Sequence, residues 1–148
     1  MPDAPPIFTI GYEKRSIDDL IWLLQARHVE RVIDVRLTPA SRRPDFAKKR
    51  LSSSLARAGI AYEHRGALGN PRAIRDVYLS GDTEAGHRQF RAHLSNGAVA
   101  ALDELAETIG SQKVALLCLE REAHRCHRSV VAAMTAERLP GERAVIHL

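Results

Sequence analysis

Both cysteines of the chain lie within one stretch of eleven residues that also carries histidines and arginines. The stretch reads CLEREAHRCHR, spans residues 118–128, and directly follows KVALL, an apolar run that predicts a buried strand. Thiols, imidazoles and guanidinium groups at the end of a strand could form a metal site, a nucleophile or an anion pocket. They could equally be the side chains of a charged loop, so their types and spacing have to be weighed one motif at a time.

The C-H-R motif opens a predicted helix, where unpaired backbone N–H groups and the helix macrodipole favour an anion. The same position favours a cysteine thiolate over the thiol. We therefore consider Cys126 and His127 as catalytic groups, with His127 able to move protons near neutral pH, and Arg128 as an anion contact. In the alternative reading, Cys126 is a small buried packing residue and Arg128 is solvated.

The C-L-E motif places Glu120 two residues after Cys118 and so on the same face of the strand. Cys118 sits in an apolar run, where a free cysteine behaves as a small hydrophobic side chain. Glu120 falls at the strand end and is our candidate general acid–base; it could also bind a ribose hydroxyl. A structural pair with Arg36 or Arg128 is the competing interpretation.

Four potential zinc ligands occur in this stretch, namely Cys118, His124, Cys126 and His127. Their spacing does not resemble the C-x2-C or H-x3-H pairs of zinc sites. Adjacent side chains such as Cys126 and His127 are expected to point in different directions, and Cys118 is expected inside the sheet. The sequence therefore predicts no metal site.

A second cationic stretch, DVRLTPASRRPDF, begins within a predicted strand at 31–37 and extends beyond it. Arginine binds phosphate or carboxylate through two parallel hydrogen bonds, so we expect Arg36 and Arg42 to contact an anion, with Ser41 supplying a hydroxyl. Asp34 precedes Arg36 by two residues, so both could face one side and form a pair.

The stretch TIGYE, after the first predicted strand, brings Gly11 and Tyr12 to the same edge. Gly11 permits a close backbone turn, and Tyr12 would line a ligand site beside it. The stretch contains neither a G-x-G-x-x-G motif nor a P-loop, so no cofactor is predicted from it.

The elements that must position these residues alternate along the chain. The predicted strands are 6–12, 31–37, 60–64, 113–119 and 143–148, and the predicted helices are 16–28, 46–59, pieces of 73–109 divided at Gly81, Gly86 and Gly97, and 126–139. Strands separated by helices predict a single α/β domain over 1–148, with a mostly parallel sheet and helices on both faces. In such sheets ligands bind outside the carboxyl ends of the strands, where the three stretches above fall.

Four stretches, taken in order, resemble the domain of unknown function 488 family: TIGYEKRSIDDLIWLL, VIDVRLTPASRRPDF, LSSSLARAGIAYEHRGALG and LLCLEREAHRCHRSVVA. The C-x-E and C-H-R pair is the most specific part of that pattern. Tyr12 and Glu13 stand where the family commonly has His and Ser, and Asn70 where it commonly has a second Gly. The resemblance implies an α/β fold and a small prokaryotic soluble protein, and it assigns no activity.

The composition of the chain limits the classes of function that remain open. The chain has 148 residues, a formal net charge of +4 and only 5% aromatic residues, which disfavours stacking platforms for single-stranded nucleic acid. With no membrane-spanning run and no disulfide framework, we expect a cytoplasmic protein without a membrane partner. Two hypotheses stay open: an enzyme acting on a phosphate-bearing small molecule such as a nucleotide, or a noncatalytic module that binds nucleic acid or a nucleotide. A homodimer is the assembly we consider beside a monomer.

Overall fold

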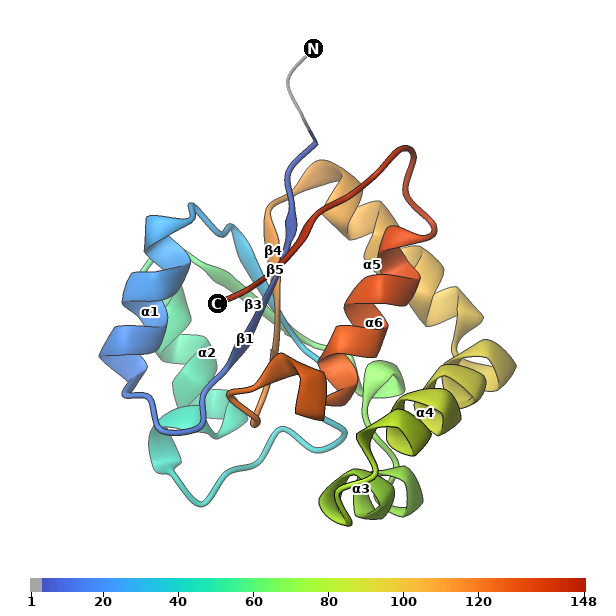
Figure 1. The fold of residues 1–148 in the computed structure, drawn as a ribbon. Coiled ribbons are helices and arrows are strands. Elements are labelled where there is room, and N and C mark those ends of the chain that lie inside the picture. The colour runs from blue at the N-terminus through green and yellow to red at the C-terminus, as the bar shows by residue number, and fades with distance from the viewer. Residues whose placement is uncertain (1–3) are drawn as a thin grey trace.

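Five short strands form a parallel sheet at the centre of the computed structural model, which describes residues 4–148 (Figure 1). The strands are β1 Ile7–Gly11, β2 Arg31–Asp34, β3 Ala61–His64, β4 Val114–Cys118 and β5 Val145–His147. Their order in the sheet is β3-β2-β4-β1-β5, and every neighbouring pair is parallel. The prediction of one α/β domain with a parallel sheet is confirmed.

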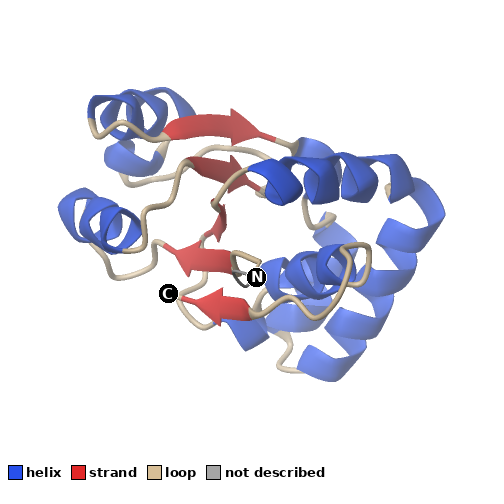
Figure 2. Ribbon diagram, turned by 90° about the horizontal axis from the view of Figure 1, so that it is seen from above, coloured by secondary structure: helices blue, strands red, loops and turns tan. Residues whose placement is uncertain are grey.

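Helices cover both faces of this sheet, as the view from above shows (Figure 2). The α-helices of residues 4–148 are α1 Ile17–Ala26, α2 Lys48–Arg57, α3 Arg72–Leu79, α4 Thr83–Gly97, α5 Val99–Ser111 and α6 His127–Ala136. Short 3-10 turns are η1 Pro44–Phe46, η2 Gly66–Leu68 and η3 Ala123–Arg125. Helices α1 and α2 pack on one face, and α4, α5 and α6 contribute to the core on the other.

Strand β4 shows why the sequence folds this way. Val114, Leu116 and Cys118 belong to the core shared with α5 and α6, while Ala115 and Leu117 belong to the core shared with α1 and α2. All five are buried, so both faces of the strand need apolar side chains and the run is continuous rather than alternating. Each fully buried leucine stabilises the fold by roughly 1.5–3 kcal/mol.

Capping residues mark where two of the helices begin. Ser16 caps α1 by accepting a hydrogen bond from the backbone N–H of Asp19 at 3.0 Å, as its position predicts. Cys126 occupies the N-cap of α6, so the predicted start of that helix is confirmed.

Several predicted boundaries were wrong, and three of them bear on the site. The strand at 31–37 ends at Asp34, and the helix expected from residue 46 begins at Lys48 because Pro44–Phe46 forms a 3-10 turn. Gly86 does not divide two helices but lies inside α4. A Cβ at Gly86 would stand 2.9 Å from the ring of Tyr78, so glycine lets α3 pack closely on α4.

The connections around β4 create a crevice at the carboxyl edge of the sheet. The chain leaves β1 and β2 toward the face covered by α1 and α2, whereas it leaves the intervening β4 toward the face covered by α6. The loops after these strands therefore diverge, which is the arrangement that opens ligand sites in parallel sheets.

Within residues 4–148, no helix combines the length and the apolar character that crossing a membrane requires.

Candidate functional site

Two adjoining hollows lie at the carboxyl edge, with volumes of about 520 Å³ and 680 Å³. They share Asn70, Arg75, Leu79, Glu120 and His127, and we call the combined space the strand-end cleft. Its floor comes from the end of β4 and the start of α6, and α3 forms one wall. Each hollow has the size of a small-molecule site.

Glu120 lies in the strand-end cleft, and its position depends on Gly11. Gly11 pairs with Cys118 at the end of the sheet, and a Cβ on it would stand 1.8 Å from the carbonyl oxygen of Glu120. The predicted close backbone approach at Gly11 is therefore present, and it brings the opening loop against the C-L-E loop. Glu13 strengthens the junction by accepting a hydrogen bond from the backbone N–H of Arg121 at 3.2 Å.

Asp34 and Arg36 form a buried ion pair. The Asp34 side chain is fully buried, and its carboxylate accepts hydrogen bonds from Arg36 Nε at 2.8 Å and from Arg36 Nη2 at 2.6 Å. Arg36 Nη1 donates to the carbonyl oxygen of Phe46 at 2.7 Å. Burial alone would lower the pKa of Arg36, but the hydrogen bonds and charge of Asp34 outweigh it and raise that pKa. The ion pair that the sequence predicted as possible is present. Arg36 lines the cleft, and its charge there is neutralised by Asp34.

Arg128 is completely buried and its guanidinium is held by protein atoms. Nε donates to Thr9 Oγ1 at 3.1 Å, Nη1 to Cys118 Sγ at 3.1 Å and to the carbonyl oxygen of Glu120, and Nη2 to the carbonyl oxygen of Arg121 at 3.2 Å. Burial lowers the pKa of Arg128 to about 10. These contacts fix the C-L-E loop against α6 rather than presenting the guanidinium to the cleft.

The two cysteines converge with His127 beside the floor of the cleft. The sulfur atoms of Cys118 and Cys126 are in bonding contact, their Cα atoms are 7.8 Å apart, and Cys126 Sγ lies 3.5 Å from His127 Nδ1. The expectation that Cys126 and His127 point apart was therefore wrong. The 3-10 turn η3 leads the chain into α6 with Cys126 in extended conformation, and this turns its side chain back toward β4.

His127 is a neutral group in this site. Burial lowers the pKa of His127 to about 4, with the charge of Arg128 acting in the same direction. Its Nε2 lies 2.7 Å from the carbonyl oxygen of Val35, which can only accept, so Nε2 carries the proton and Nδ1 presents a lone pair to Cys126. The expectation that His127 titrates near neutral pH is therefore replaced by a fixed neutral tautomer.

The remaining predicted residues divide between the cleft and the surface around it. Tyr12 lines the cleft and stacks on Phe46, with ring centroids 4.6 Å apart. Ser41 accepts a hydrogen bond from the backbone N–H of Arg43 at 3.1 Å, and Arg42 is exposed. Neither Ser41 nor Arg42 is among the residues that line the two hollows.

Helix α3 supplies site residues that the sequence reasoning missed. Arg72 and Arg75 are exposed and line the cleft, and they take no part in the ion pairs of residues 4–148. Three exposed leucines, Leu37, Leu79 and Leu119, line the same hollow. The available signal was the spacing of Arg72 and Arg75, which puts both on one side of a helix directly after the L-G-N loop.

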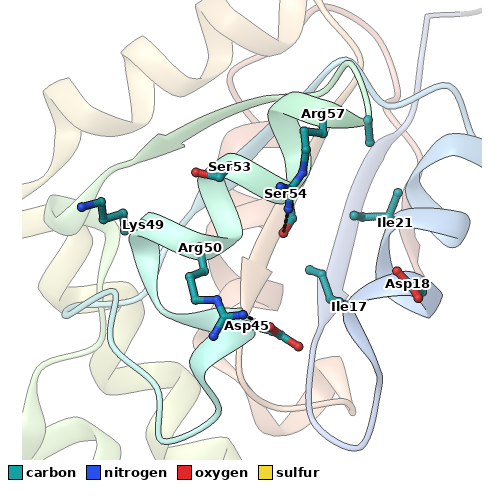
Figure 3. Close-up of a pocket in the computed structure, with 10 residues that line it drawn as sticks. Ile17, Asp18, Ile21, Asp45, Lys49, Arg50, Ser53, Ser54 and Arg57 are labelled. Carbon is teal, nitrogen blue, oxygen red and sulfur yellow. Dashed lines mark hydrogen bonds and ion pairs between the residues drawn. The ribbon is translucent and has the colours of Figure 1, made fainter.

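A separate groove of about 620 Å³ runs between α1 and α2 (Figure 3). Figure 3 shows Arg50 paired with Asp45 at one end of the groove and Ile17 and Ile21 on the opposite wall. The Arg50 Nη2 and Asp45 Oδ1 atoms are 3.5 Å apart. None of the site residues predicted from the sequence lines this groove. The candidate residues that follow the strand ends therefore lie outside this groove.

Comparison with known proteins yields one match. The family model described as Domain of unknown function DUF488 matches residues 16–135. No curated protein and no solved structure matches the chain.

Proposed function

We propose, for a chain that belongs to the DUF488 family, that the strand-end cleft binds a phosphate-bearing small molecule of nucleotide or nucleoside-like chemistry and acts on it as an enzyme. The observation that carries this proposal is the set of side chains that line one of the two hollows. Of the five large apolar side chains exposed in residues 4–148, three line one hollow: Leu37, Leu79 and Leu119. Arg72 and Arg75 line that hollow with them.

An apolar surface beside two cationic groups suits a ligand with two parts. The leucines would contact a planar or apolar body such as a nucleobase, and the guanidinium groups of Arg72 and Arg75 would hold a phosphate through paired hydrogen bonds. The formal net charge of +4 adds attraction for an anion at long range.

We assign the anion contacts to Arg72 and Arg75 because the other two arginines are already engaged. Arg36 is neutralised by Asp34, and Arg128 has protein acceptors on each of its nitrogens. Both act as positioning residues in this proposal, since they hold the loops whose side chains form the cleft.

Glu120 is the proposed acid–base group. It lines both hollows, and its Oε2 lies 3.3 Å from Cys118 Sγ at the floor of the cleft. A carboxylate at hydrogen-bonding distance from a bound hydroxyl, amine or water can transfer a proton to or from it during the reaction. His127 is neutral and has a low pKa, so it is a weak base for this step.

Thermal shifts test the binding part of the proposal. The purified chain is heated with inorganic phosphate, adenosine, adenosine 5′-monophosphate or a short oligonucleotide. We expect the monophosphate to raise the Tm more than phosphate or adenosine, by roughly 5–10 °C when the ligand is at one hundred times its Kd. Arg75→Ala should lose this shift, whereas Arg27→Ala, an exposed arginine at the opposite edge of the sheet, should keep it.

Two other outcomes would contradict the small-molecule proposal. A shift with the oligonucleotide alone, falling steeply as salt is raised, would favour the noncatalytic nucleic-acid module. A monophosphate shift that survives Arg75→Ala would move the site away from the cleft. For catalysis, Glu120→Gln should bind the ligand and abolish its turnover.

A further inference from the structure

Beside the floor of the strand-end cleft lies a compact cluster of metal-ligating side chains. The ligand atoms of Cys118, Cys126 and His127 all lie within 4.8 Å of one another, and all three residues are buried. From this geometry we propose that the cluster binds one zinc ion when a thiol reductant has converted the bonded sulfurs of Cys118 and Cys126 to thiolates. The proposal stands apart from the function proposed above, because it concerns the protein without any ligand.

The donor set fits zinc. Two thiolates and one imidazole are ligands that Zn²⁺ binds in four-coordinate sites, and three protein ligands leave a fourth position for water or substrate. Cys118 and His127 also line the hollow that contains Glu120, so the fourth position faces the cleft. Glu120 stays outside the ligand set, where its carboxylate could hydrogen-bond to a zinc-bound water.

His127 is oriented in the way that ligating histidines are. Its Nε2–H donates to the carbonyl oxygen of Val35 at 2.7 Å, which leaves the Nδ1 lone pair directed at Cys126 Sγ. A hydrogen bond from the second ring nitrogen to a carbonyl fixes the tautomer and aims the ring at the metal. The edge of the ring also packs against Phe90, with centroids 5.1 Å apart.

Arg128 contacts the sulfur of Cys118 directly. Its fully buried guanidinium makes no ion pair with a carboxylate anywhere in residues 4–148. Instead, Nη1 donates to Cys118 Sγ at 3.1 Å. The charge of the Glu120 carboxylate acts on Arg128, and Glu120 Oε2 lies 3.3 Å from Cys118 Sγ, so a cation and a carboxylate both border the cluster.

The backbone spacing of the two cysteines also favours a shared ion. Their Cα atoms are 7.8 Å apart, whereas disulfides usually join Cα atoms about 4.4–6.8 Å apart. Two thiolates that share a zinc ion, at about 2.3 Å each, span a larger distance than two sulfurs that share a bond. Cys126 caps α6, where the helix N-terminus further stabilises a thiolate.

Metal analysis of the untagged chain tests the proposal. The protein is purified with reductant, its zinc content is measured, and the zinc is then exchanged for cobalt. We expect about one zinc per chain, a thiolate-to-cobalt absorption band, and a Tm that falls by roughly 5–10 °C on chelation and recovers when zinc is returned.

Variants locate the ion. Cys126→Ser should lose the zinc while keeping the helix, because serine is also a good N-cap residue. His124→Ala is the matched control, since His124 is exposed in the same loop and outside the cluster. Arg75→Ala and Glu120→Gln should both keep the zinc, so failure of the ligand site and failure of the metal site are distinguishable.

A chain that contains no metal, shows no cobalt band and keeps the same Tm in added zinc would overturn the proposal. This holds whether thiol titration then finds two free thiols or a disulfide. Zinc that survives Cys126→Ser would overturn it as well, because the ion would then lie elsewhere.

Discussion

Replacing Asp34 by asparagine should destabilise the protein severely, because Asp34 and Arg36 form a buried ion pair. Their side chains are 0% and 7% exposed. Asparagine keeps one oxygen acceptor but turns an N–H₂ group toward the donors that the second carboxylate oxygen now satisfies. Those donors are Arg36 Nη2 at 2.6 Å and the Tyr62 hydroxyl at 2.5 Å.

The expected loss of stability follows from the charge of Arg36, which Asp34→Asn would leave unpaired. Removing one partner of a buried ion pair costs about 3–5 kcal/mol, since the other charge is left in a medium of low polarity. At roughly 2–4 °C per kcal/mol for a chain of this size, the Tm should fall by roughly 6–20 °C. Urea denaturation followed by circular dichroism gives the free energy of unfolding directly.

The chain supplies a matched control on its surface. Asp45 pairs with Arg50 at 3.5 Å, and their side chains are 50% and 67% exposed, so Asp45→Asn should cost at most about 1 kcal/mol. The double variant Asp34→Asn with Arg36→Met should recover part of the loss, because no unpaired charge remains. If Asp34→Asn costs no more than Asp45→Asn, Arg36 is not committed to Asp34 and its assignment as a positioning residue is wrong.

Other expected outcomes follow from single contacts. Gly11→Ala should cost more than about 3 kcal/mol or prevent folding, because its Cβ would overlap the carbonyl of Glu120; a variant with unchanged urea midpoint would refute the close approach. Ser16→Ala should cost about 1 kcal/mol in the same assay by removing the α1 cap, and no change would show that the cap is dispensable. His147→Asn should remove part of the loss of stability below a pH of about 6.5, seen by urea denaturation at several pH values, while His127 supplies another part; an unchanged slope would exclude a contribution from His147.

His147 is expected to lower the stability of the fold as the pH falls. Burial lowers the pKa of His147, and the charge of Arg128 adds to the effect. The folded state therefore binds a proton less readily than the unfolded state, so stability is present above a pH of about 6.5 and declines as the pH falls toward the folded pKa.

The sequence alone was sufficient for the framework of the fold. The apolar run of β4 and the Ser16 cap are local signals, and both structures form where they predict. The spacing of Asp34 and Arg36 likewise predicted their pair, because side chains two apart face the same side of an extended segment.

Other features depend on tertiary contacts and could not be predicted. Cys118 and Cys126 converge only because the η3 turn redirects the chain, which residue spacing does not reveal. Arg72 and Arg75 line the cleft because α3 packs on α4. Helix α3 has no buried residue and no side-chain N-cap, so the sequence gives few signals of where it lies. The position of such a helix is set by how the neighbouring helices pack, which the sequence does not show.

Chemical-shift mapping tests the central claim most directly. Adenosine 5′-monophosphate is titrated into the ¹⁵N-labelled chain, and the backbone amides that shift are assigned. The account predicts shifts concentrated in residues 70–79 and 118–127, which form the strand-end cleft, with the amides of the groove between α1 and α2 unchanged. Shifts confined to that groove, or none at saturating ligand, would contradict it.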